Sequence, residues 1–158
     1  MWNIFSLFDV AIFTCAGRPK GQKMINMLFN KEEQEKFKYI FYQEDTQATT
    51  IYRTDVMDRE AFVLFKDCRN VWAKLGDQYD EGNTLLIDDS PTKAFVNPAW
   101  TALFPDPFKY DDTEDSFLMN ILLPYLWGLE GAYDVSCYLL NHSPKWSLLN
   151  ARRDMAKD

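Results

Sequence analysis

Cysteine and histidine are scarce in this chain. Its 158 residues include three cysteines, Cys15, Cys68 and Cys137, and one histidine, His142. No CxxC motif or Cys/His spacing of the zinc-binding kind occurs, which excludes the common structural zinc sites. Three widely separated cysteines are also untypical of a disulfide framework, so we expect a reducing compartment. We therefore predict an intracellular location, nuclear or cytoplasmic, and disfavour a mitochondrial one because no Arg-rich, acid-poor transit peptide is present.

Long apolar runs and an excess of basic residues are missing as well. No stretch approaches the ~20 apolar residues of a membrane-spanning helix. The start, MWNIFSLFDVAIFTCAG, superficially resembles a signal peptide, but it lacks a basic segment and Asp9 interrupts it. We interpret it as a chain that begins inside a domain. The net charge of −7 disfavours nonspecific nucleic-acid binding, and it also fits poorly with a highly anionic substrate.

The composition is that of one packed globular domain. Hydrophobic residues make up 47% and aromatic residues 16% of the chain, which argues against disorder. Apolar runs and helical periodicities alternate, and this alternation predicts an α/β fold with a mostly parallel sheet. The predicted strands are 9–15, 37–42, 83–88 and 101–104, with a further strand that leads into a helix over 59–75. The other predicted helices are 1–8, 22–30 and 116–131, and 134–140 is a last helix or strand.

Several local expectations accompany these elements. The segments 17–21 and 43–58 are predicted loops, and 31–38 is a charged, solvated segment. The helix over 22–30 is expected to direct Met24, Met27 and Leu28 inward. The acidic run 111–115 is expected to cap the helix that follows it, and Pro124 is expected to kink that helix.

Two adjacent carboxylates follow a short apolar run. Leu85, Leu86 and Ile87 lead into Asp88 and Asp89, and a Ser-Pro pair ends the strand. Ligands of open α/β sheets bind beyond the carboxyl ends of such strands, and two carboxylates there repel each other unless a cation lies between them. Mg²⁺ is the usual hard, oxygen-binding candidate. The alternative is an ordinary turn, in which aspartate is common.

Two further residues extend this pattern towards phosphate chemistry. Thr14 lies at the carboxyl end of the strand DVAIFTC, where a hydroxyl can contact a phosphate oxygen. Lys66, in VLFKDCRNVW, can neutralise a phosphoryl group. Taken singly, Thr14 is more simply a strand residue and Lys66 a solvated cation. A hydroxyl, a lysine and an acidic pair in this order are typical of phosphoryl transfer.

These segments resemble the haloacid dehalogenase superfamily. FDVAIFTCA, VLFKDCRNVW and NTLLIDDSPTKAFVNP are similar to three consecutive motifs of its branch of protein Ser/Thr phosphatases that act on the RNA polymerase II C-terminal domain. YQEDT and FPDPFKYDDTEDSFLMNILLPYLWGL are similar to that branch's loop and closing segment. The resemblance covers roughly residues 1–140. It implies a Rossmann-like domain over residues 1–145, followed by a charged tail over 146–158.

The resemblance also implies roles for the residues named above. Thr14 would bind the substrate phosphoryl group, and Lys66 would orient and neutralise the aspartyl-phosphate intermediate. Asp88 would be a direct Mg²⁺ ligand, and Asp89 would act through water. The expected partner is a phosphorylated protein or peptide. Cys15 stands where this branch usually has serine, and we interpret it as a plain buried thiol.

The nucleophile motif of the family is missing. The family carries DxDx[TV] at the end of its first strand, and no aspartate of this chain lies in such a motif. Without the nucleophile the covalent route is closed, so we expect this chain to be inactive by itself. In the family the missing strand lies in the sheet centre, between DVAIFTC and NTLLIDD. Three consequences are possible. Those two strands pair directly, the fold is only marginally stable, or the sequence is an incomplete stretch of a longer protein, and we favour the last.

Three functions remain open on the sequence alone. The first is a Mg²⁺-dependent phosphoprotein phosphatase domain that lacks its nucleophile segment here. The second is a non-catalytic binding or scaffold module of the same fold, because one family member is a receptor subunit of the mitochondrial inner-membrane translocase. The third is a fragment that does not fold stably.

Overall fold

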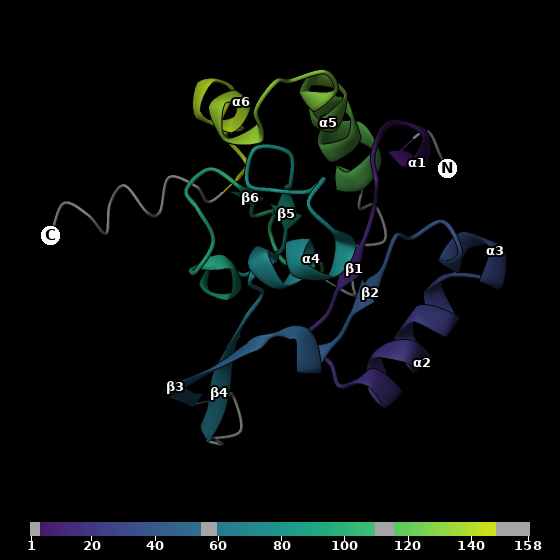
Figure 1. Cartoon of the computed structure of the whole chain (residues 1–158), viewed down its shortest axis with the longest axis vertical. Coiled ribbons are helices and arrows are strands. Elements are labelled where there is room, and N and C mark those ends of the chain that lie inside the picture. Colours follow the sequence, from purple (N-terminus) through teal and green to yellow (C-terminus); the bar gives the residue numbers. More distant parts are fainter. Residues whose placement is uncertain (1–3, 55–59, 110–115, 148–158) are drawn as a thin grey trace, which may run out of the picture. The chain divides into compact units, whose positions relative to one another are not determined.

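The computed structural model describes residues 4–54, 60–109 and 116–147 (Figure 1). The chain divides into two compact units, which are described one at a time below. The first unit is Met1–Gln78 with Thr92–Asn97, and the second is Tyr79–Pro91 with Pro98–Asp158. In the described ranges, no helix is long and apolar enough to cross a membrane.

The first unit is built around a short parallel strand pair. Strand β1 (Ile12–Phe13) pairs with β2 (Ile40–Phe41), with Ile12 opposite Ile40 and Phe13 opposite Phe41. The amide of Thr14 donates to the carbonyl of Phe41 at 2.9 Å and continues the ladder beyond β1. Phe41 is fully buried, as expected for a β-branched and aromatic run. The predicted strands 9–15 and 37–42 are therefore confirmed, although both are shorter than predicted.

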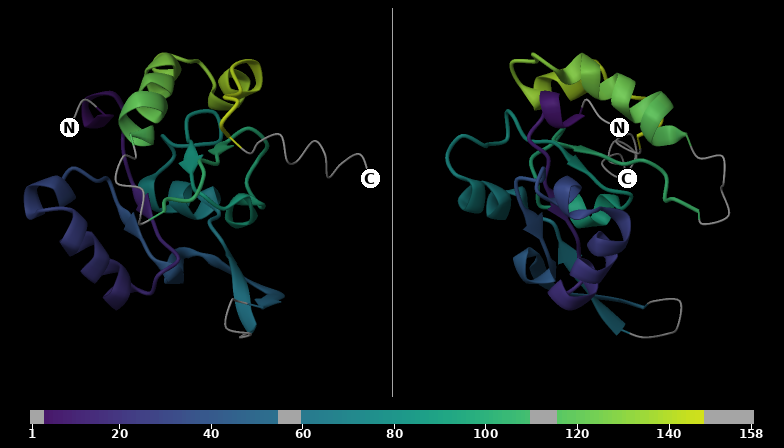
Figure 2. Two further views of the ribbon diagram at one scale, coloured as in Figure 1. Left: turned by 180° about the vertical axis from the view of Figure 1, so that it is seen from behind. Right: turned by 90° about the vertical axis from the view of Figure 1, so that its right-hand side faces the viewer.

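Helices flank this pair in the first unit (Figures 1 and 2). They are α1 (Ile4–Leu7), α2 (Arg18–Leu28), α3 (Lys31–Gln34) and α4 (Cys68–Leu75). The prediction of a loop over 17–21 is wrong, because α2 already begins at Arg18. Pro19 occupies its first turn, where a missing N–H costs nothing. Gly21 lies within the helix, and glycine suits this position because a Cβ there would lie 2.8 Å from the Tyr42 ring.

The inward direction predicted for Met24, Met27 and Leu28 is also wrong. These side chains are 47%, 78% and 71% exposed. The helix rests instead on Gly21 and Ile25, which are buried. The close approach of Gly21 to the Tyr42 ring helps to set which side of α2 faces inward.

The prediction of a loop over 43–58 is wrong for residues 47–54, which form a strand. Strand β3 (Gln47–Thr54) pairs antiparallel with β4 (Glu60–Phe65), with Gln47 opposite Phe65 and Thr54 opposite Glu60. Threonine, isoleucine and tyrosine over 49–52 favour extended structure once a partner strand is present. Residues 55–59 lie outside the described ranges.

The prediction of a strand that leads into a helix over 59–75 is confirmed by β4 and α4. Asp67 caps α4 by accepting a hydrogen bond from the amide of Arg69 at 3.0 Å. The helix ends at Gly76, whose φ of 103° favours glycine.

Asp45 joins the turn after β2 to α4. Its buried carboxylate accepts a hydrogen bond from the amide of Tyr42 at 2.8 Å and forms an ion pair with Lys74. Its carbonyl accepts from the side chain of Asn70 at 2.9 Å. Burial by itself would raise the pKa of Asp45, but the hydrogen bonds from Lys74 and Tyr42 and the charge of Lys74 together lower that pKa below its ordinary value.

The second unit contains another parallel pair and two helices. Strand β5 (Leu86–Ile87) pairs with β6 (Ala102–Leu103), with Leu86 opposite Ala102. Helix α5 (Leu123–Leu129) follows a π-helical turn (Leu118–Leu122), and α6 (Val135–Asn141) is capped by Asp134. The strands 83–88 and 101–104 are thus confirmed in shorter form, and 134–140 is a helix. The predicted acidic cap over 111–115 lies outside the described residues.

The predicted helix over 116–131 is confirmed, but its first part is irregular. The amide of Leu123 donates to the carbonyl of Leu118, five residues back, so the helix widens immediately before Pro124. Proline at the start of α5 has no amide to donate, and its ring fits the first turn of the regular helix that follows.

The described residues form three two-stranded sheets, β1–β2, β3–β4 and β5–β6. The predicted α/β class is therefore confirmed, whereas one continuous Rossmann-like sheet stays a prediction. Direct pairing of the strands over 9–15 and 83–88, one of the expected consequences of a missing strand, is absent among the described residues.

We expect Asp45→Asn to lower the free energy of unfolding by about 1–3 kcal/mol, because it removes the charge partner of the half-exposed Lys74 from a buried site. The lowered pKa of Asp45 means that its contribution is present above pH 3.8 and is lost as the pH falls through the folded-state pKa. Urea unfolding measured from pH 7 to pH 2 checks both points.

The matched control for this experiment is Glu44→Gln. Glu44 pairs with Arg18 at 2.8 Å, but both side chains are about half exposed, so little stability should be lost. Equal stability and equal acid sensitivity of Asp45→Asn and the parent would contradict the assignment.

Candidate functional site

Thr14 lies at the carboxyl end of β1, as predicted. Its side chain is half-buried, and its Oγ1 accepts a hydrogen bond from the amide of Ala16 at 3.1 Å. This short turn holds the hydroxyl beside the first backbone amides after the strand. Hydroxyl and amide groups at such a strand end are the donors that contact phosphate oxygens in α/β proteins.

Lys66 is buried, so the reading of this residue as a solvated cation is wrong. Only 8% of the residue is exposed. It follows β4 directly and stands just before α4. Its Nζ lies 5.8 Å from the centroid of the Phe13 ring, which places the ammonium next to the end of β1. The first unit therefore brings Lys66 close to the residue that precedes Thr14.

Asn97 holds the backbone around Lys66, a function that the sequence did not suggest. The buried Asn97 side chain accepts from the amide of Cys68 at 2.8 Å and donates to the carbonyl of Lys66 at 2.8 Å. It also donates to the carbonyl of Ala94 at 3.2 Å. The amide of Lys66 donates to the carbonyl of Lys93 at 2.7 Å. The segment 92–97 thus fixes both sides of the β4–α4 junction.

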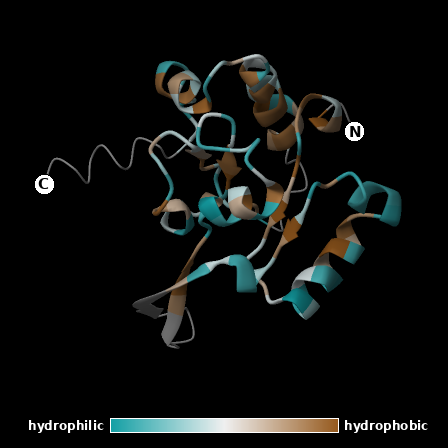
Figure 3. Cartoon of the chain, viewed as in Figure 1, coloured by the Kyte–Doolittle hydropathy of each residue, from teal (hydrophilic) through white to brown (hydrophobic). Residues whose placement is uncertain are grey.

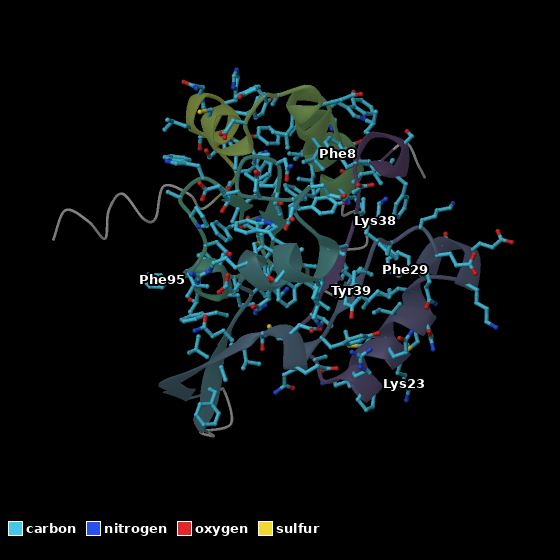
Figure 4. All side chains as sticks on the ribbon, in the orientation of Figure 1. Phe8, Lys23, Phe29, Lys38, Tyr39 and Phe95 are labelled. Atoms are coloured by element: carbon cyan, nitrogen blue, oxygen red, sulfur yellow. The ribbon has the colours of Figure 1, made fainter. Side chains whose placement is uncertain are left out.

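Asp67 and Phe95 are further residues beside the β4–α4 junction. Asp67 is buried, caps α4 and forms an ion pair with Arg69 at 2.7 Å. Phe95 of the 92–97 segment is exposed and projects away from the ribbon at the edge of Figure 4. The only sequence signal for this role of Asn97 is that an asparagine occurs in the mixed polar and apolar segment KAFVNP.

The buried thiol at the start of α4 is not a nucleophile. Burial of Cys68, and next the charge of Asp67, raise its pKa to about 12, although Lys66 opposes the shift. Cys15 is half-buried and forms no disulfide. The exposed His142 stacks on Tyr138, with ring centroids 4.4 Å apart. None of these contacts is a Cys–His pair of the catalytic kind.

Asp88 and Asp89 end β5 in the second unit, as predicted, but their environments differ. The amide of Asp88 donates to the carbonyl of Leu103 at 3.1 Å, and its Oδ1 accepts from the amide of Ser90 at 2.9 Å. Asp88 is 7% exposed, whereas Asp89 is exposed. The backbone therefore orients the carboxylate of Asp88, which is the residue expected to bind metal directly.

The acidic pair fits Mg²⁺ better than it fits a closed metal cage. Among the described residues, no group of three or more His, Cys, Asp or Glu side chains could hold a metal. Mg²⁺ is commonly held by one or two carboxylates and completes its shell with water and substrate phosphate. A buried, oriented carboxylate next to an exposed one suits such an open site.

The predicted site residues thus fall into two groups. Thr14 and Lys66 belong to the first unit, and Asp88 and Asp89 belong to the second. Within the first unit, the structure brings Lys66 to the end of β1. The second unit supplies the acidic pair at the end of its own parallel strand.

Comparison with known protein families gives one match. The family model described as "NLI interacting factor-like phosphatase" matches residues 2–136, which is most of the chain. The matched range contains Thr14, Lys66, Asp88, Asp89 and Asn97. A search among curated proteins finds no match.

We expect Asn97→Ala to lower the free energy of unfolding by about 2–4 kcal/mol, because it leaves buried backbone groups at the β4–α4 junction without partners. Denaturant unfolding followed by circular dichroism measures this loss. Asn120→Ala, at an exposed position, is the control and should cost less than about 0.5 kcal/mol. A similar small loss for both variants would show that Asn97 does not hold the junction.

Proposed function

Because the chain belongs to the NLI interacting factor-like phosphatase family, whose members have the haloacid dehalogenase fold, we propose that it binds a phosphorylated protein or peptide together with Mg²⁺. The observation that carries this proposal is the burial of Lys66 beside the end of β1. The Lys66 ammonium at this position can neutralise a phosphoryl group, which is the anion that this family handles.

Each of the four residues has a role that its surroundings support. Lys66 neutralises the phosphoryl group, and its position depends on the hydrogen bonds of Asn97. Thr14 donates its hydroxyl proton to a phosphoryl oxygen while Ala16 donates to the hydroxyl oxygen. Asp88 would hold Mg²⁺ directly, and Asp89 would act through water.

When bound, Mg²⁺ would neutralise charge on the phosphoryl oxygens. Residues of the chain itself orient the groups that would bind the metal and the phosphoryl group. The Ser90 amide keeps the Asp88 carboxylate oriented, and Asn97 keeps the backbone of Lys66 in place. In the first unit, Lys66 and Thr14 would bind and orient the phosphoryl group, and none of the groups named here attacks phosphorus.

The sequence contains no DxDx[TV] motif, and so it supplies no nucleophile of the family's kind. Phosphoryl transfer through an aspartyl-phosphate therefore cannot proceed on this chain by itself. A non-catalytic binding or scaffold role is the second candidate, and the retention of Lys66 in a buried position without a nucleophile favours it. The odd number and wide spacing of the three cysteines support an intracellular location as part of this proposal.

We expect Mg²⁺ to raise the thermal stability of the chain through Asp88. At a concentration about 100 times its Kd, a ligand adds about 2.7 kcal/mol to the free energy of unfolding. Asp88→Asn should abolish the Mg²⁺-dependent rise in Tm, and Asp89→Asn should reduce it. The quantity compared is the difference between Tm with and without Mg²⁺, so an intrinsic change in stability does not confuse the test.

Asp106→Asn is the matched control, because Asp106 is exposed and lies outside the acidic pair. It should keep the full response to Mg²⁺. If Asp88→Asn and Asp106→Asn respond alike, or if the parent chain shows no Mg²⁺ response, the proposed metal role of Asp88 fails.

A further inference from the structure

Helix α2 exposes an apolar and basic stripe that the proposed function does not use. Lys20, Lys23, Met24, Met27 and Leu28 follow the helical spacing i, i+3, i+4, i+7 and i+8, so they share one side of the helix. We call this set the α2 outer face. Figure 3 colours part of the α2 ribbon as hydrophobic, and Figure 4 labels Lys23 on the same helix.

The apolar part of this face is large for a single helix of eleven residues. Met27 is 78% and Leu28 is 71% exposed, and Met24 is about half exposed. Contiguous exposed apolar side chains rimmed by polar groups mark interaction surfaces in folded proteins. Methionine is common on surfaces that adapt to peptide partners, because its side chain is flexible and polarisable.

A neighbouring side of α2 is already packed, and Leu28 lies at its border with the outer face. Gly21 and Ile25 are buried, and the hydroxyl of Tyr42 donates to Oε1 of Gln22 at 2.6 Å. Directly after the helix, the ring of Phe29 packs edge-on against that of Phe37 at 5.1 Å. These contacts fix the helix and leave its outer face to solvent.

Charge on α2 has one sign only. The sequence of the helix, RPKGQKMINML, contains no acidic residue, although the whole chain has a net charge of −7. Arg18 is paired with Glu44 at 2.8 Å. By contrast, Lys20 and Lys23 form no ion pair with any residue that the structure describes. The outer face therefore offers two uncompensated cations beside three exposed apolar side chains.

We propose that the α2 outer face binds an acidic amphipathic segment of a partner protein. The apolar side chains of such a segment would cover Met24, Met27 and Leu28, and its carboxylates would lie against Lys20 and Lys23. Charges separated by more than a Debye length of about 8–10 Å are largely screened. The acidic remainder of the chain therefore does not cancel the attraction between Lys20, Lys23 and a short acidic segment.

Two other classes of occupant fit the face less well. An anionic bilayer extends over many Debye lengths and would be repelled by the net charge of −7. Nucleic acid gains its affinity from many phosphate contacts, and two lysines neutralise few phosphates, while three apolar side chains contribute little to phosphate binding.

The test uses a fluorescein-labelled helical peptide of about 18 residues with leucine on one face and glutamate on the other. Fluorescence anisotropy should show saturable binding to the parent chain. Lys20→Glu/Lys23→Glu should weaken binding by at least about tenfold, and so should Met27→Ser/Leu28→Ser. A charge-swapped peptide, with lysine in place of glutamate, should prefer Lys20→Glu/Lys23→Glu to the parent.

The matched control is Lys31→Glu/Lys36→Glu, which changes the same charge at exposed positions outside the stripe and should bind like the parent. Circular dichroism of each variant checks that α2 is retained. The proposal is overturned if the control loses as much affinity as Lys20→Glu/Lys23→Glu, or if the charge-swapped peptide binds the parent equally well. Binding only to phosphatidylserine vesicles, and not to the peptide, would also overturn it.

Discussion

The hydrogen bonds of one buried asparagine hold the junction on which the first unit depends. Asn97 bridges the backbone on both sides of Lys66, and Lys66 separates the last residue of β4 from the capped start of α4. Desolvating a lysine ammonium is unfavourable, so the chain must fix its position tightly for the burial to be useful. The Phe13 ring at 5.8 Å and the rigid backbone together place that charge at the end of β1.

A second constraint links the same helix to the strand pair. Asp45 and Asn70 connect the turn after β2 with α4, and Lys74 reaches from α4 to the Asp45 carboxylate. The helix that carries Lys66 at its entry is therefore anchored near both ends. Although β1 and β2 are short, hydrogen bonds therefore fix the residues that follow the strands of the first unit.

Sequence patterns predicted the elements whose signals are local. The strand and helix over 59–75 were predicted because an apolar run passes into helical periodicity, and Asp67 is a typical cap. The strand over 47–54 was missed, because its extended form depends on pairing with β4 and not on its own polar composition. The start of α2 was missed because Gly17, Pro19 and Gly21 resemble a loop, while Pro19 in fact occupies the first helical turn.

The sequence predicted which residues form the candidate site, but not the hydrogen bonds that hold those residues in place. Thr14, Lys66 and the acidic pair follow strands, which sequence can indicate. The burial of Lys66 depends on Asn97, which is 31 residues further along the chain, and no local pattern relates the two. In the same way, hydrophobic periodicity marked Met24 and Met27 but could not tell which side of α2 meets Tyr42, since a close approach at Gly21 helps to decide it.

The role proposed for Asp88 and Asp89 depends on the absence of the nucleophile motif DxDx[TV] from the sequence. The amide of Ser90 orients Asp88, and Asn97 fixes the backbone of Lys66, but no DxDx[TV] motif occurs in the sequence. The function proposed above assigns metal and phosphate binding to these groups, while the covalent step of the family needs a nucleophile that this sequence does not contain.

Hydrolysis of p-nitrophenyl phosphate by the purified chain in the presence of Mg²⁺ tests this account most directly. Because the sequence contains no nucleophile motif, the parent chain and Asp88→Asn should both show no turnover above the rate in buffer. Turnover by the parent that Asp88→Asn abolishes would contradict it, because it would show that this chain carries a nucleophile of its own.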